Sequence, residues 1–189
     1  GWYTNSALTN SAGKAGATYT ATSNITLYAK WTPNTNTVYK VNVYVMDTSG
    51  KYSTLQQYSY TGTTDTSVTI DESIYYPDKS GQFRLDINKS NVLTGTIKGD
   101  GSLVLVVYIE RASHTVTYNG NGGTPVTQTR NVYYQGAVDF TLKAEKKDWT
   151  FIGWNTDKNA TEKLDSLTMG TSNITLYAIF NCVPKATFY

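Results

Sequence analysis

Alternating apolar and polar residues predict strands in the middle of the chain. From residue 39 to residue 45, tyrosine and valine occupy every odd position. Side chains of a strand point alternately to its two sides, so this pattern predicts a strand with one buried face. A turn at 47–50 follows, and residues 56–61 form the predicted return strand. Residues 103–109 are apolar at every position, which predicts a central strand covered on both faces.

Shorter elements are predicted between these strands. Residues 71–76 predict a short helix that ends before Pro77, because the residue before a proline disfavours helical geometry. Residues 82–87 predict a short strand, and Gly-Asp-Gly at 99–101 predicts a tight turn. The middle of the chain therefore holds four or five strands and at most one helix.

The last third follows a similar plan with different residues. Strands are predicted to begin at Val116, to return at 131–134 and to continue at 149–154, with 173–180 closing the sheet. The asparagine- and glycine-rich segment 119–123 must turn. Residues 137–147 form either a short helix or a long crossing loop. We expect Gly153 to let another backbone approach closely.

A repeat connects the two ends of the chain. Residues 23–29 are identical to residues 172–178, and a Gly-Trp dipeptide precedes each copy. The first copy is only half as long, so we expect its strand at 24–31 to lack partners within its own unit. That strand is unfolded, docks on the middle of the chain, or completes a sheet in a neighbouring chain. Tandem repeats are typical of surface or scaffold proteins.

These signals predict a division of the chain into five segments. Gly1 falls inside a repeat, so we expect the sequence to be a fragment of a larger protein. The predicted segments are half a repeat at 1–32, a linker at 33–36, a β-rich unit at 37–111, a complete repeat at 112–180, and the start of a next unit or a tail at 181–189.

Composition narrows the possible chemistry. The net charge of +2 is too small to indicate nucleic acid or an anionic membrane as partner, and no apolar run is long enough to span a membrane. The single histidine, His114, and the single cysteine, Cys182, lie far apart without a catalytic motif. Asp86 and Asp100 sit in turn sequences without calcium-loop spacing. We therefore expect no enzyme, no cofactor and no metal site.

Aromatic residues are the strongest candidates for a contact surface. The chain has 16 tyrosines and 4 tryptophans. Alternation along the strands assigns most of them to the core or to cross-strand pairs, and Trp2 and Trp154 recur at matched positions, as structural residues do. Four tyrosines are candidates for an exposed ligand-contact surface, with a structural role as the alternative, and these are Tyr75, Tyr76, Tyr133 and Tyr134. A covalent link between a strand lysine and an asparagine, for instance Lys40 and Asn42, is a further alternative.

The last unit resembles the Listeria–Bacteroides repeat, the B-repeat of internalin-type surface proteins. The matching segments, in the family's order, are 116–123, 134–136, 149–154 and 174–178, and the first copy matches at 1–3 and 27–31. The middle unit resembles a mucin-binding-protein type of repeat, through 39–44, 60–63, 95–97 and 101–108.

Both resemblances imply small β-grasp-like units in secreted, cell-wall-attached bacterial proteins, so the expected fold class is mainly β (α+β). Neither family brings a catalytic residue. The implied function is a non-enzymatic stalk or adhesin segment, in contact with neighbouring repeats and with host or matrix glycans or glycoproteins. The alternatives are a carbohydrate- or mucin-binding module that uses exposed aromatics, and accessory modules that tether a secreted enzyme.

Overall fold

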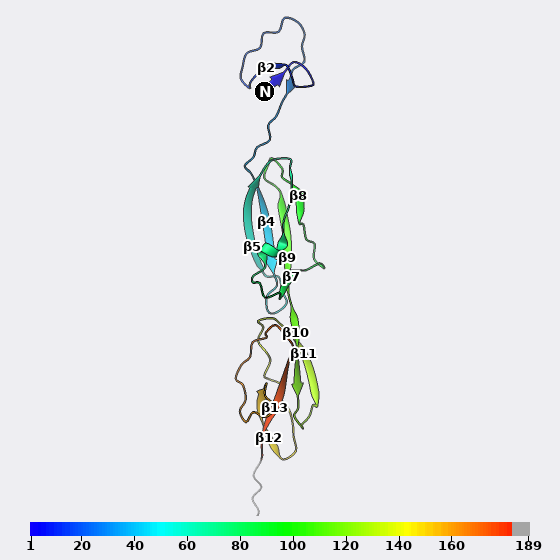
Figure 1. Ribbon diagram of the computed structural model, residues 1–189, viewed down its shortest axis with the longest axis vertical. Coiled ribbons are helices and arrows are strands. Elements are labelled where there is room, and N and C mark those ends of the chain that lie inside the picture. Colours follow the sequence, from blue (N-terminus) through cyan, green and yellow to red (C-terminus); the bar gives the residue numbers. More distant parts are fainter. Residues whose placement is uncertain (183–189) are drawn as a thin grey trace, which may run out of the picture.

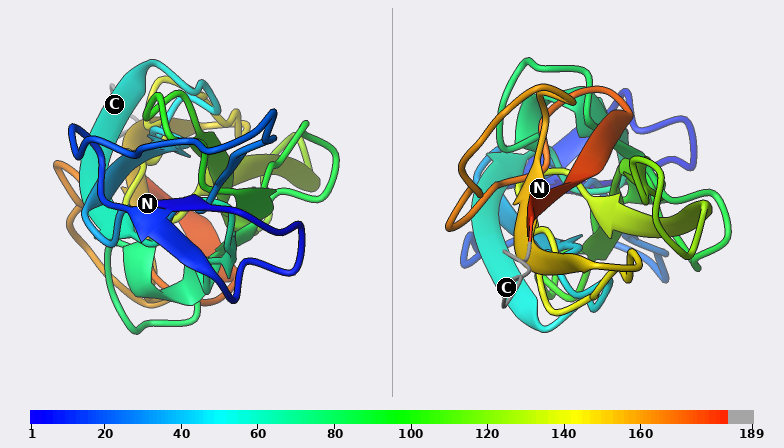
Figure 2. Two further views of the ribbon diagram at one scale, coloured as in Figure 1. Left: turned by 90° about the horizontal axis from the view of Figure 1, so that it is seen from above. Right: turned by 90° about the horizontal axis from the view of Figure 1, so that it is seen from below.

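The structure, a computed structural model, describes residues 1–182, and almost all of its regular secondary structure is β-strand. Three units follow one another along the molecule: a first unit (residues 1–32), a middle unit (37–111) and a last unit (112–180). Figure 1 shows them arranged end to end, and the views along the long axis in Figure 2 show that they overlap in a narrow cross-section. No helix in the described part of the chain is long and apolar enough to cross a membrane.

The middle unit is a four-stranded sheet with a smaller pair of strands beside it. The sheet order is β5-β4-β9-β7, and β6 pairs with β8. β4 and β9 run parallel, with Val41 opposite Leu105, while the other neighbours are antiparallel. The elements are β4 (Thr37–Val45), β5 (Thr54–Gly62), β6 (Ser67–Thr69), the 3₁₀ helix η1 (Glu72–Tyr75), β7 (Phe83–Leu85), β8 (Thr94–Thr96) and β9 (Val104–Arg111).

Alternation correctly predicted the buried face of this sheet. The odd-numbered residues of β4 and β9 point into one core, where Val41, Val43 and Leu105 are completely buried. The short helix expected at 71–76 is present as η1, and the Asp71 carboxylate accepts a hydrogen bond from the Ser73 amide at its start. Burial of this apolar face supplies the main driving force for folding of the unit.

The prediction that β9 is covered on both faces is wrong. β9 lies inside the sheet, between β4 and β7, but its second face is only partly covered. Val104 is exposed there, and Tyr108 is shielded by the rings of Tyr44 and Tyr52 at centroid distances of 4.7 and 5.3 Å. An apolar strand therefore tolerates a half-open face where aromatic neighbours cover part of it.

The last unit repeats the topology of the middle unit. Its sheet order is β11-β10-β13-β12, again with a parallel pair, β10 and β13, at the centre. The core contains Val116, Tyr118, Trp154 and Leu176, all completely buried. The strands are β10 (Ser113–Asn119), β11 (Thr127–Tyr133), β12 (Trp149–Asn155) and β13 (Ile174–Cys182).

Several details of the last unit correct the sequence-based expectations. β13 is a central strand rather than a closing one, because it pairs with β10 on one side and β12 on the other. Residues 137–147 contain no helix and form the crossing loop. Gly153 sits at an irregularity of β12, and an added Cβ would lie 2.6 Å from the Cβ of Lys163. Gly153 is therefore needed to make room for the Lys163 side chain and not, as expected, for another backbone.

The end of the last unit reaches slightly beyond the predicted boundary at residue 180. Residues 181 and 182 still belong to β13. The rest of the expected tail, 183–189, lies outside the described residues.

The first unit forms a small sheet of its own. The strands β1 (Trp2–Tyr3), β2 (Ser11–Gly13) and β3 (Tyr28–Ala29) are arranged in the order β2-β1-β3. The expectation that the strand near residue 28 lacks partners within its unit is wrong, because β3 pairs with β1. The pairing is only two residues long, however, and most of the segment predicted as strand at 24–31 stays outside it.

Candidate functional site

Two of the four candidate contact tyrosines, Tyr75 and Tyr76, make hydrogen bonds within the middle unit. Tyr75 is buried, and its hydroxyl donates a hydrogen bond to the Tyr60 hydroxyl at 3.1 Å. Burial is the main cause that raises the pKa of Tyr75 above its usual value. The Tyr76 hydroxyl accepts a hydrogen bond from the Leu85 amide at 3.1 Å. The prediction that Tyr75 is an exposed contact is therefore wrong, because η1 turns its ring into the core.

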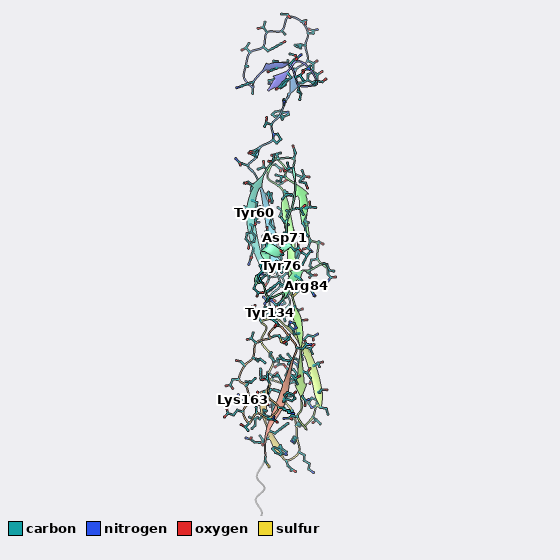
Figure 3. The ribbon with its side chains drawn as sticks, viewed as in Figure 1. Tyr60, Asp71, Tyr76, Arg84, Tyr134 and Lys163 are labelled. Carbon is teal, nitrogen blue, oxygen red and sulfur yellow. The ribbon has the colours of Figure 1, made fainter. Side chains whose placement is uncertain are left out.

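Tyr133 and Tyr134 lie at the junction between the middle and last units. Both side chains are half-buried. The Tyr133 ring lies over Gly50, so closely that a Cβ added there would be 2.8 Å from the ring. The Tyr134 ring packs edge-on against Phe83 of the middle unit, 6.0 Å between centroids, and Figure 3 shows Tyr134 between the two units. The four tyrosines therefore do not share one exposed surface.

Arg111 is the polar centre of this junction. Its guanidinium donates from Nε to the Met46 carbonyl of the middle unit at 3.2 Å, and from Nη1 to the Tyr134 carbonyl of the last unit at 3.0 Å. Nη1 also donates to Oε1 of Gln135 at 2.8 Å. The guanidinium carbon lies 4.8 Å from the centroid of the Phe83 ring. One side chain thus binds both units, as the planar, multiply donating guanidinium group allows.

The backbone at this junction is nearly continuous strand. A single residue, Ala112, separates the end of β9 from the start of β10. Its amide donates to the Gln82 carbonyl and its carbonyl accepts from the Tyr134 amide, each at 2.8 Å. The Gln82 side chain is also bonded to His114, with 2.6 Å between Oε1 and Nε2. We call this set of contacts the joint, made by Arg111, Ala112, Met46, Gln82, His114, Gly50, Phe83, Tyr133, Tyr134 and Gln135.

Sequence reasoning missed the joint. It assigned Ala112 to the complete repeat at 112–180 and gave Arg111 no role. The one available signal was that the apolar run at 103–109 is followed almost at once by the next strand pattern at Val116. Such a short gap leaves no room for a flexible connection.

Carboxylates of the middle unit stabilise turns. Asp47 accepts hydrogen bonds from the amides of Lys51 and Ser49 and from the Ser49 hydroxyl, and these donors lower the pKa of Asp47 to about 2. The buried Asp86 accepts from the Tyr52 hydroxyl at 2.7 Å and from the Asn88 amide at 2.9 Å. Burial opposes ionisation of Asp86, but these hydrogen bonds outweigh it and lower its pKa. Within residues 1–182, no three histidine, cysteine or acidic side chains gather as metal ligands do.

The four tryptophans differ in their environments. Trp154 is completely buried, donates from Nε1 to the Leu142 carbonyl at 2.8 Å and contacts the Tyr118 ring at 5.2 Å. Trp149 is exposed and lies under Lys146, with 4.5 Å from Nζ to the ring centroid. Trp2 and Trp31 are also exposed. The structural interpretation is therefore confirmed for Trp154 and wrong for its repeat equivalent Trp2.

An aromatic surface is present at a place that sequence reasoning did not indicate. β5 is the edge strand of the middle sheet, and its Tyr58 and Tyr60 are partly exposed. A shallow hollow of about 410 Å³ lies beside it, lined by Val38, Tyr39, Ser59, Tyr60 and Thr61. Figure 3 shows Tyr60 on the middle unit, away from the joint.

Comparison with known proteins identifies the repeats. The family model described as the Listeria-Bacteroides repeat domain matches residues 1–30 and 114–179. A protein of Evansella cellulosilytica, whose name provisionally assigns it to the membrane proteins, is 29% identical over 169 residues. That alignment covers 84% of this chain but 23% of the relative, so the chain spans about a quarter of the relative's length. Because the family model covers half of its residues, the chain belongs to the Listeria-Bacteroides repeat family, which is typical of bacterial surface proteins.

Proposed function

We propose that this segment is a non-enzymatic spacer of an extracellular, cell-wall-attached bacterial surface protein, and that it holds its units in a fixed line. The observation that carries the proposal is the joint, where Arg111 binds carbonyl groups of two successive units. A spacer needs units that fold separately and junctions that resist bending. The two separate cores and the one-residue connection at Ala112 supply both features.

The joint resists bending because a rotation there breaks several contacts together. Turning one unit against the other pulls Arg111 from either Met46 or Tyr134, and a hydrogen bond from a charged donor contributes about 1.5–3 kcal/mol. The same rotation separates Tyr134 from Phe83 and uncovers the edge of the middle core, on which Tyr134 packs. The single histidine, His114, is bonded to Gln82 inside the joint, which favours a structural role for it.

Distances between spin labels on the two units test the proposal. Cysteines replace the exposed Ile87 and Val126, while Cys182 is changed to serine. We expect a narrow distance distribution in this background and a broad one after Arg111→Ala. The matched control is Arg84→Ala, because Arg84 pairs with Glu110 inside the middle unit and leaves the joint intact. A broad distribution before any joint substitution would refute the spacer function.

A second function, contact with glycans of host or matrix glycoproteins, is favoured by the hollow beside β5. Partly exposed tyrosine rings beside hydroxyl and amide groups suit sugar binding, because rings stack on apolar sugar faces while polar groups bond to hydroxyls. The resemblance of residues 37–111 to mucin-binding repeats supports the same function. We expect Tyr60→Ala, which removes a ring that lines the hollow, to reduce retention on immobilised mucin, while Ile74→Ala, on η1, leaves it unchanged. Equal retention of both variants and the parent would exclude this surface.

A further inference from the structure

The strand β5 is an unprotected edge of the middle sheet. It lies at the end of the order β5-β4-β9-β7, and Figure 1 shows it at one side of the middle unit. Residues 55–61 are all exposed. β5 pairs with β4 along its whole length without a bulge, and its sequence contains no charged residue and no proline. Every second residue of an edge strand turns its N–H and C=O away from its neighbour, so β5 offers a long, regular row of hydrogen-bonding groups.

The other edges of the two four-stranded sheets are protected. β7 has only three residues, and its Leu85 amide donates to the Tyr76 hydroxyl at 3.1 Å. A loop covers β12, because the Trp154 carbonyl accepts from the Leu164 amide at 2.8 Å. β11 carries the exposed Arg130 at its centre. Proteins prevent edge pairing with charges, short strands and covering segments, and none of these protects β5 within residues 1–182.

We propose that β5 pairs antiparallel with β5 of a second copy of this chain, so that two four-stranded sheets join into one of eight strands. A second copy fits because the strand is neutral, and a neutral strand pairs with itself without repulsion between like charges. β5 has nine residues, so two antiparallel copies overlap fully only when its central residue, Tyr58, lies on the two-fold axis. Gln57 then lies opposite Ser59, and Leu55 opposite Thr61.

The opposed side chains are complementary in this register. Each of the two pairs of Gln57 with Ser59 brings an amide beside a hydroxyl, and both groups donate and accept hydrogen bonds. The Leu55 side chain, 47% exposed, gains an aliphatic contact with the methyl group of Thr61. Opposed residues have Cβ atoms about 4.5–5.5 Å apart, which is close enough for both kinds of contact. A second copy therefore matches the strand residue by residue.

The pair is weak and closes at two copies. One strand edge buries far less than the roughly 1,600 Å² of a standard interface, so we expect a dissociation constant on the order of 0.1 mM. The two-fold pair uses both copies of the edge, so no third copy adds through β5.

The direction of the pair matters for a surface protein. The strands of the middle unit follow the long axis of the molecule in Figure 1, so two antiparallel copies run in opposite directions. Chains that extend from one surface all point the same way. The pair therefore joins chains on two facing surfaces, where many weak pairs act together. This last step rests on the spacer function, whereas pairing of free chains in solution does not.

Analytical ultracentrifugation of the whole chain measures the pairing without attachment to a surface. We expect mainly monomer at about 5 µM and mainly dimer at about 0.5 mM, given a dissociation constant on the order of 0.1 mM. The double variant Gln57→Lys/Ser59→Lys places lysines opposite each other in both pairs and should weaken the dimer at least about tenfold. The control Thr127→Lys/Thr129→Lys adds the same charge at the same spacing on the edge strand β11 and should leave the dimer unchanged.

A charge swap separates loss of pairing from loss of folding. Gln57→Glu/Ser59→Glu should also remain monomeric by itself. An equal mixture of the lysine and glutamate variants should restore the dimer to within about threefold of the parent's affinity, because each lysine then lies opposite a glutamate.

Cysteines test the register directly. In the Cys182→Ser background, Gln57→Cys mixed with Ser59→Cys should form a disulfide-linked dimer in air at least about tenfold faster than either variant alone, because only the mixture places two cysteines directly opposite each other. Four results would overturn the proposal: a monomer at about 0.5 mM, a lysine variant that pairs as well as the parent, a charge-swapped mixture that stays monomeric, or equal rates of disulfide linkage.

Discussion

Replacing Trp154 by alanine tests whether the contribution of a residue to stability depends on its burial in the fold or on its place in the repeat sequence. Trp154 is completely buried between Tyr118 and Phe151, with ring centroids 5.2 and 5.4 Å away. Trp2 occupies the same place in the repeat sequence but is 43% exposed. The same substitution at the two sites therefore removes the same atoms from two different environments.

The expected cost at Trp154 follows from the contacts that are lost. Truncating a buried tryptophan costs about 3–5 kcal/mol through lost burial and the cavity that remains. The Leu142 carbonyl also loses its donor, which adds about 1 kcal/mol. A unit of about 70 residues has roughly 3.5–10 kcal/mol of stability in total. Trp154→Ala should therefore unfold most of the last unit's population or leave it marginal.

The control and a graded variant sharpen the test. Trp2→Ala should leave the unfolding of the last unit unchanged, because the first unit does not touch Trp154's core. Trp154→Phe keeps an aromatic ring but removes the bond to Leu142, so it should cost roughly 1–3 kcal/mol. At position 154, alanine should therefore destabilise the last unit more than phenylalanine does, relative to the parent tryptophan.

Urea unfolding followed by circular dichroism measures these changes, and hydrogen exchange at β12 and β13 assigns the transition to the last unit. The linear dependence of the unfolding free energy on urea gives each value. If Trp154→Ala lowers the unfolding free energy of the last unit by less than about 1 kcal/mol, the burial argument fails.

Three further predictions concern the middle unit. Gly50→Ala should lower stability by more than Gly81→Ala. Both glycines have positive φ, so alanine costs about 1–2 kcal/mol of unfolding free energy at either site, but only at Gly50 would the added Cβ lie 2.8 Å from the Tyr133 ring. Thermal denaturation of the two variants measures the difference. The Asp47 carboxylate should titrate with a midpoint of about 2 by ¹³C NMR, and because its pKa is lowered on folding, its contribution to stability is complete above about pH 4 and is lost as the pH falls towards 2. Tyr52→Phe should cost about 1–3 kcal/mol in chemical denaturation and raise the pKa of the buried Asp86, since it removes the hydroxyl that donates to this carboxylate; an unchanged Asp86 titration would contradict the assignment.

Periodicity predicted the buried face of β4 because a strand's side-chain period of two is a property of the backbone itself. The same reasoning wrongly predicted that both faces of β9 are covered. Seven apolar residues in a row do not say what lies over the second face, and there the rings of Tyr44 and Tyr52 provide only partial cover. Local pattern therefore gives the face that is buried, while the degree of cover depends on residues far away in the sequence.

The joint was beyond the reach of sequence reasoning for a similar reason. Arg111 bonds to carbonyl groups of Met46 and Tyr134, and any residue type offers a carbonyl, so no side-chain pattern marks its partners. Tyr133 and Tyr134 were singled out as candidates for an exposed aromatic contact surface. Their environment at the joint makes them structural contacts instead.

The shared topology of the middle and last units explains how a spacer of this kind can be built from unlike sequences. In both units the first and last strands run parallel at the centre, as in the pairs Val41 with Leu105 and Tyr118 with Leu176. In both, the first strand enters and the last strand leaves in the same direction. The last strand of one unit can then continue as the first strand of the next, as β9 continues into β10 through Ala112. A straight junction is therefore a consequence of the parallel central pair, and Arg111 fixes a direction that the topology already favours.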